Sequence, residues 1–189
     1  SEKKADFWET IGLIWDAVCD SDYAVIRKEG FEADDMIADL TYEATQEGIQ
    51  SVIYSSDGDL HQCLDTGMVT QCTRVRRVFG GNIEYTYMTS AKLFQEYRAH
   101  PWQRVEFRCL SGDKSDTLKA IPGLGPVDAG KVMEFCGSLD GFLANPLAAP
   151  ISGKHRQEII DFCKSEKREV FQRLMKLGYQ PFIDGILAV

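Results

Sequence analysis

Apolar residues recur every three or four positions between residues 4 and 19, a spacing that predicts an amphipathic helix. The same spacing over residues 32–47, followed by Gly48, predicts a second helix that ends at the glycine. A short apolar stretch at residues 50–56 predicts a buried strand. The other elements expected in this half are strands at residues 23–27, 68–73 and 75–87, a turn at residues 80–82 and a short helix at residues 59–64. Because strands and helices alternate, we expect an α/β fold with a twisted, mainly parallel sheet.

The pattern changes near residue 88. All six prolines lie at residue 101 or later, and the later segments with helical spacing are residues 90–100, 102–110, 127–135, 139–144, 154–163 and 166–177. We therefore expect two parts, with residues 1–88 as an α/β part that carries the acidic site and residues 89–189 as a helical part.

The composition narrows the class of protein. With 44% hydrophobic residues the chain can form a substantial core, while no apolar run is long enough to cross a membrane. The six cysteines are scattered without a C-x-x-C pair, which favours reduced thiols in a cytoplasmic protein over disulfides or a zinc site. The net charge of −8 is unusual for a DNA-binding protein, but seven of the 29 acidic residues fall in three clusters that bound cations would neutralise. A merely acidic soluble protein remains the alternative.

The three acidic clusters lie where an α/β enzyme would bind a ligand. One opens the helix at residues 32–47, one follows the strand at residues 50–56, and the third has two aspartates three positions apart, which face the same side of a helical turn. The carboxyl ends of parallel strands share one edge of a sheet, so we expect the first two clusters to meet there. The members of the clusters are Glu32, Asp34, Asp35, Asp57, Asp59, Asp113 and Asp116.

An all-oxygen ligand set of this kind suits a hard cation, with Mg²⁺ as the first expectation and Mn²⁺ as the second. Two such cations on a bed of carboxylates suit phosphodiester hydrolysis, because one activates a water molecule and the other stabilises the leaving oxygen. His61, His100 and His155 are expected to be surface or hydrogen-bonded histidines, not ligands. The simpler alternative is that the acids of the first cluster only cap the helix that they open.

A glycine hairpin follows the third acidic cluster. Residues 121–126 read IPGLGP, and a helix is expected to begin at Val127. Glycines at alternate positions, Gly123 and Gly125, would let backbone N–H groups approach a phosphate closely, although an ordinary capped turn has the same features. Basic side chains nearby would add phosphate contacts, while those on the strand at residues 75–87 and just before it could instead protect an exposed strand edge. These basic residues are Lys114, Lys119, Lys131, Arg74 and Arg76.

In this order, the motifs resemble those of the flap endonuclease family, which includes bacteriophage 5′→3′ exonucleases and the 5′-nuclease domain of bacterial DNA polymerase I. The resemblance spans about residues 23–142. It implies a PIN-like 5′-nuclease core followed by a helical part that contains a helix–hairpin–helix. The stretches that carry the resemblance are EADD at residues 32–35, SDGDLHQ at residues 56–62, GDKSD at residues 112–116 and IPGLGP at residues 121–126.

The resemblance also implies a role for each motif. The first acidic cluster would serve one metal site, and the other two clusters would serve a second site or bridge the two. Residues 123–129 would form the helix–hairpin–helix that grips duplex phosphates, with a bound K⁺. The implied substrate is DNA with a 5′ end, a flap or a single-strand/duplex junction, with RNA·DNA hybrids as a further expected substrate. We expect the protein to act as a monomer, away from membranes.

One departure from the family's pattern concerns the start of the chain. The family's first strand with its aspartate, its second aspartate and its basic helical arch have no counterpart before Glu32. We therefore expect a fragment that lacks an N-terminal portion, binds branched or duplex DNA and cuts it slowly. Two alternatives remain open. One is a PIN-like ribonuclease, which the glycine hairpin disfavours, and the other is a non-catalytic DNA-binding module, which the clustered acids disfavour.

Overall fold

The structure is a computed structural model that describes residues 2–112 and 121–177, and the chain divides into two compact units, residues 1–33 and 34–189. The first unit contains helix α1 (Glu2–Cys19), which confirms the helix predicted there. The strand predicted at residues 23–27 is wrong, because residues 24–28 form no regular element. A strand needs a hydrogen-bonded neighbour, and no other segment of the described chain pairs with this one; Tyr23 is 81% exposed.

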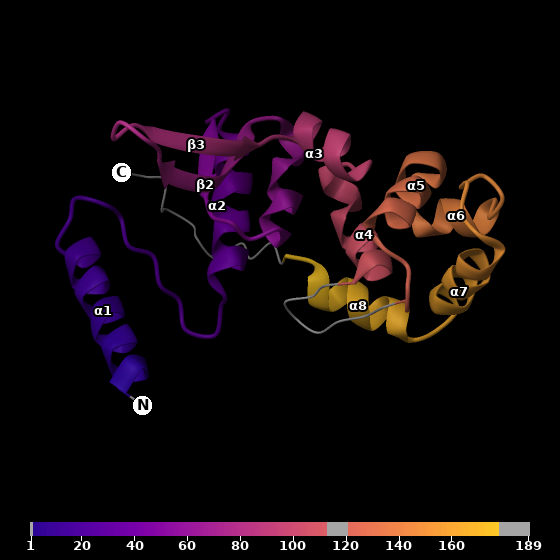
Figure 1. Ribbon diagram of the computed structural model, residues 1–189, viewed down its shortest axis with the longest axis horizontal. Coiled ribbons are helices and arrows are strands. Elements are labelled where there is room, and N and C mark those ends of the chain that lie inside the picture. The colour runs from indigo at the N-terminus through magenta and orange to yellow at the C-terminus, as the bar shows by residue number, and fades with distance from the viewer. Residues whose placement is uncertain (1, 113–120, 178–189) are drawn as a thin grey trace. The chain divides into compact units, whose positions relative to one another are not determined.

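A three-stranded mixed sheet lies in the second unit (Figure 1). Strand β1 (Ser51–Tyr54) pairs in parallel with β2 (Val69–Arg77), and β2 pairs antiparallel with β3 (Ile83–Met88). The predicted α/β class is therefore confirmed, with one antiparallel strand added by the turn at residues 80–82. The prediction that the strand at residues 50–56 is buried is only half right. Ile53 is buried, whereas Val52 and Tyr54 on the other face of β1 are exposed.

Helix α2 (Ala33–Gln46) and the 3₁₀ helix η1 (Asp59–Thr66) flank the sheet and confirm two further predictions. The left-handed backbone of Gly48, at φ 72°, follows α2 as a helix-ending glycine should. A hydrophobic cluster joins the sheet to η1 and to the helix at residues 90–97. Its buried members are Ile53, Leu60, Leu64, Val69, Met88 and Leu93.

The helices after residue 89 form a second cluster. They are α3 (Ser90–Tyr97), η2 (Pro101–Gln103), α4 (Arg104–Ser111), α5 (Pro126–Cys136), α6 (Leu139–Ala144), α7 (Gly153–Cys163) and α8 (Lys167–Met175), all close to the predicted helices. Figure 1 shows the sheet and α2 at one end of this unit and α5 to α7 at the other, with α3 and α4 between them. Side chains such as Phe107, Leu110 and Phe142 form the core of this cluster. The domain boundary near residue 88 stays a prediction.

Two features of the described chain bear on its class. None of its helices is both long and apolar enough to cross a membrane. The cysteines are free thiols, and burial raises the pKa of Cys109 to about 12 and that of Cys163 to about 11.

Candidate metal centre and nucleic-acid interface

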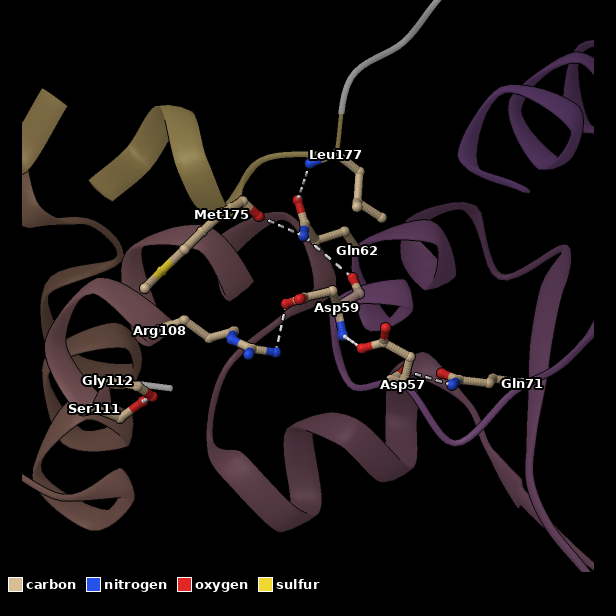
Figure 2. A network of polar contacts seen from close by, with 9 residues as sticks. All are labelled: Asp57, Asp59, Gln62, Gln71, Arg108, Ser111, Gly112, Met175 and Leu177. Carbon is tan, nitrogen blue, oxygen red and sulfur yellow. Dashed lines mark hydrogen bonds and ion pairs between the residues drawn. The ribbon is translucent and has the colours of Figure 1, made fainter. Parts of the chain in front are cut away.

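The turn after β1 carries two of the predicted metal-binding carboxylates. The N–H of Asp59 donates to Oδ1 of Asp57 at 2.9 Å, so the two residues are held together by the turn itself (Figure 2). Gln71 of β2 is fully buried and donates from Nε2 to the carbonyl oxygens of Ser55, at 2.8 Å, and Asp57, at 2.7 Å. The turn is thus anchored to the neighbouring strand, and both carboxylates lie at the carboxyl end of β1, as predicted.

A second anchor joins this turn to the end of α8. Gln62 donates from Nε2 to the carbonyl oxygen of Asp59 at 3.2 Å and to that of Met175 at 2.9 Å. Its Oε1 accepts the N–H of Leu177 at 3.3 Å. Gln62 lies within the SDGDLHQ motif, but this link was not predicted, because Met175 and Leu177 are more than 110 positions away.

The most informative contact at this turn comes from α4. Nη1 of Arg108 forms an ion pair with Oδ1 of Asp59, and the two side chains are only 12% and 21% exposed. Figure 2 shows Arg108 reaching from α4 toward Asp59, with Ser111 and Gly112 one turn further along. Asp113 follows Gly112 directly in the chain. The ion pair therefore holds against Asp59 the helix that leads into the third acidic motif. Arg108 was not among the predicted site residues, and its one local signal was a charged residue between Phe107 and Cys109.

A buried basic group lies behind Arg108. The guanidinium of Arg104 is sandwiched between the rings of Tyr97 and Phe107, with its Cζ atom 4.7 Å from each ring centre. Burial and the charge of Arg108 lower the pKa of Arg104 to about 10. Burial and the charges of both arginines lower the pKa of His61 to about 4, so its imidazole is neutral at physiological pH. The positive charge beside the turn therefore comes from the arginines of α4 and not from His61.

The first acidic cluster is divided between the two units. Glu32 is exposed in the first unit, and Asp34 and Asp35 lie in the first turn of α2. Oδ1 of Asp34 accepts the N–H of Asp35 at 2.9 Å, so part of the simpler capping role is present. Burial raises the pKa of the Cys63 thiol, and the charge of Asp34 raises it further, which indicates that the start of α2 lies near η1.

The predicted metal site includes residues outside the described ranges. Within residues 2–112 and 121–177, no three acidic, histidine or cysteine side chains come close enough together to hold a metal ion. The predicted partners Asp113 and Asp116 lie outside these ranges. The donors that the structure does bring together at the turn, Asp57 and Asp59, are carboxylates, which fit a hard divalent cation. The seven-residue ligand set stays a prediction.

The glycine hairpin is held by its apolar residues. Ile121 and Leu124 are buried, and Gly123 between them is exposed with a left-handed φ of 82°. Helix α5 begins at Pro126, one residue before the predicted start, and Val127 in its first turn is 72% exposed. The hairpin therefore presents backbone and the first turn of a helix to solvent, which is the arrangement that an anion-binding turn needs.

Of the predicted basic contacts, Lys131 and the two arginines can be placed. Nζ of Lys131 donates to Asp128 at 2.7 Å, and Nδ1 of His155 lies 2.9 Å from the other oxygen of that carboxylate. The hydrogen bond from Lys131 and that from His155 lower the pKa of Asp128. Lys131 therefore shares its charge with Asp128, and its predicted phosphate contact stays a prediction. Lys114 and Lys119 lie outside the described residues.

The arginines of β2 lie on a two-stranded ribbon. Arg74 and Arg76 are exposed, and Nε of Arg76 pairs with Glu84 of β3 at 2.6 Å. Strand β1 pairs with β2 only as far as Cys72, so both readings of these arginines, phosphate contact and edge protection, stay open.

Comparison with known proteins independently supports the predicted family. Residues 1–98 match the family described as 5′-3′ exonuclease, N-terminal resolvase-like domain. The thermostable DNA polymerase I of Thermus aquaticus is 34% identical over 140 residues, which cover 74% of this chain and 16% of that protein. The 5′-3′ exonuclease of Mycoplasma genitalium is 35% identical over 138 residues, which cover 71% of this chain and 45% of that protein. The chain thus spans less than half of either relative.

Solved structures with the same fold come from bacteriophage T5. A T5 5′-exonuclease with bound zinc has a TM-score of 0.71 at 19% identity, covering 94% of this chain and 62% of that one. A complex of the T5 flap endonuclease with DNA and metal ions has a TM-score of 0.63 at 16% identity, covering 93% of this chain and 70% of that one. At this level of identity the likeness establishes the fold, which agrees with the predicted PIN-like 5′-nuclease core.

Proposed function

Because the chain belongs to the family of 5′-3′ exonuclease N-terminal, resolvase-like domains, we propose that it is a structure-directed, metal-dependent 5′-nuclease. It hydrolyses phosphodiester bonds of DNA near 5′ ends, flaps or single-strand/duplex junctions. The observation that carries this proposal is the ion pair between Arg108 and Asp59. That contact holds α4, and with it the start of the GDKSD motif, against the carboxylate turn, although Asp59 and Asp113 are far apart in the sequence.

The proposed cofactor is Mg²⁺ or Mn²⁺, held as two ions by the seven clustered carboxylates. Asp57 and Asp59, with Asp113 and Asp116, form one site or bridge two, and the acids at residues 32–35 complete the other. When bound, the cations supply an activated water and stabilise the leaving oxygen. The Asp57–Asp59 turn contributes by arriving pre-organised, because the N–H of Asp59 holds the carboxylate of Asp57 and Arg108 holds that of Asp59 before any cation binds.

DNA is proposed to bind across the hairpin and the basic side chains around it. The backbone at exposed Gly123 and half-buried Gly125 would bind a phosphate of the duplex, with K⁺ as a further proposed ligand there. Further phosphate contacts are assigned to Lys114, Lys119, Lys131, Arg74 and Arg76. The complex of the T5 flap endonuclease with DNA and metal ions supports this choice of substrate. Action on RNA·DNA hybrids and a monomeric state remain predictions.

The test is cleavage of a labelled 5′-flap duplex by excess protein, so that a single turnover is followed. We expect slow release of short 5′ products with Mg²⁺ and none with a chelator. Replacement of Asp57 by Asn should slow cleavage about 10²–10³-fold, because stabilisation of developing charge is a large catalytic contribution. The matched control is Asp161→Asn, an exposed aspartate on α7 that should leave the rate unchanged. Cleavage that survives the chelator, or equal rates for Asp57→Asn and wild type, would contradict the proposal.

A further inference from the structure

We infer that Arg108 is a positioning residue that acts as an internal counter-cation for Asp59, keeping this carboxylate in place before a metal binds and lowering the affinity of the site for that metal. The inference rests on the proposed function, since it takes Asp59 to be a metal ligand. It concerns a residue of α4 that lies in none of the recognised acidic or hairpin motifs.

The first argument is the burial of the ion pair. Arg108 and Asp59 are only 12% and 21% exposed at their side chains, so water screens their attraction poorly. A carboxylate this buried, next to Asp57, would be costly without a positive partner. Arg108 supplies that charge from a helix that is packed into the core through Phe107 and Leu110. Asp59 therefore has a defined position even without a divalent ion.

The guanidinium of Arg108 also lies directly beside the turn. A Cβ atom added at Gly58 would lie 3.6 Å from Nη1 of Arg108, an ordinary van der Waals distance. Arg104, clamped between the rings of Tyr97 and Phe107, adds a second positive charge behind it. Arg104 is fixed by this stacking, whereas Arg108 reaches its partner at the tip of its side chain.

The consequence is competition between charges. A divalent ion that binds Asp59 must either displace Arg108 or share the carboxylate with it. Like charges a few ångströms apart in a poorly screened site repel strongly, so the arginine weakens metal binding. A neutral side chain at position 108 should remove that repulsion. Asp59 would then lack the positive charge of Arg108 until the metal binds.

The experiment is calorimetric titration of Mn²⁺ into wild type, Arg108→Gln and Arg108→Lys. We expect Arg108→Gln to bind Mn²⁺ about tenfold more tightly than wild type. Arg108→Lys keeps the charge and should stay within about threefold of wild type. The matched control is Arg98→Gln, which removes an arginine that pairs with Glu134 on the surface, 59% exposed, and should bind Mn²⁺ as wild type does.

Thermal unfolding gives a second readout that does not depend on cleavage. Without metal, Arg108→Gln should melt at a lower temperature than wild type. Saturating Mn²⁺ should raise the melting temperature of Arg108→Gln by more than it raises that of wild type. If Arg108→Gln is unfolded without metal, circular dichroism should show that Mn²⁺ refolds it at concentrations that saturate wild type. Failure to refold would overturn the inference.

The remaining outcomes separate this inference from the proposed function. Equal or weaker Mn²⁺ affinity in Arg108→Gln, with normal binding by wild type, overturns the role of Arg108 alone. Absence of Mn²⁺ binding by wild type overturns both.

Discussion

Gly130 of α5 lies against the backbone of Tyr97 at the end of α3, so close that a Cβ atom at position 130 would fall 2.4 Å from the Tyr97 carbonyl oxygen. Tyr97 packs against both hydrophobic clusters, and its ring also stacks on Arg104 behind the carboxylate turn. The helix that carries the glycine hairpin and the side chains behind Asp59 thus meet at one residue. Close approach at Gly130 sets the spacing between the proposed DNA-binding and metal-binding elements.

Replacement of Gly130 by Ala should therefore destabilise the protein. The added methyl must push against a backbone oxygen, which cannot rotate away as a side chain can, so we expect a loss of about 1–3 kcal/mol in the free energy of unfolding. Urea denaturation measures it. Gly153→Ala on α7 is the control, since no atom lies within 4 Å of the added Cβ and the stability should stay near that of wild type. Equal stability of the two variants would show that α5 shifts freely.

The hairpin glycines should differ in what their replacement does. Gly125 has an ordinary φ of −101° and open space around it, so Gly125→Val should fold normally and weaken duplex DNA binding about 3- to 10-fold by crowding the phosphate. Gly123→Val should also destabilise the protein, because Gly123 has a left-handed φ of 82° that a valine adopts only with strain. Fluorescence anisotropy with a labelled duplex measures the affinity, which should also fall with added salt.

Two results would argue against the hairpin as a phosphate seat. One is unchanged duplex affinity in Gly125→Val, and the other is an affinity that does not respond to salt. Mn²⁺ binding, which depends on a different element, should be the same in Gly125→Val and wild type and serves as the check that the fold is intact.

The Asp128 carboxylate should make stability depend on pH. Its pKa is lowered from the ordinary 3.8 in the folded protein by Lys131 and His155, so its contribution is present above pH 3.8 and is lost as the pH falls through the lower folded value. Asp128→Asn should therefore be less stable than wild type at neutral pH, and the difference should shrink below about pH 4. Urea denaturation across this range measures it, with Asp161→Asn as the control. A difference that stays constant down to pH 3 would contradict this account.

Local signals were enough to predict much of the fold. The helices from Ser90 to Met175 lie within a few residues of their predicted bounds, because apolar periodicity and caps such as Thr89, Ser138 and Ser152 are encoded locally. The strand predicted at residues 23–27 failed for the opposite reason, since strand formation depends on a pairing partner that the composition of the segment does not reveal.

The sequence predicted where the carboxylates of the turn lie, but not which side chains contact them. The Asp57–Asp59 turn follows from its place after a strand, and the turn in the structure lies where that argument put it. Arg108 was missed because its partner is 49 positions away and no local spacing marks a buried ion pair. The pairing of Lys131 with Asp128 one helical turn away was likewise not predicted, whereas its phosphate contact stays a prediction.

The central claim is that carboxylates from separate motifs share one divalent ion, and calorimetry with Mn²⁺ on wild type, Asp57→Asn and Asp113→Asn tests it most directly. We predict that each replacement weakens Mn²⁺ binding at least about 10- to 100-fold, which is the loss typical of a residue that only supports a ligand, while Asp161→Asn binds as wild type does. Affinities for Mn²⁺ that are equal in wild type, Asp57→Asn and Asp113→Asn would contradict the account.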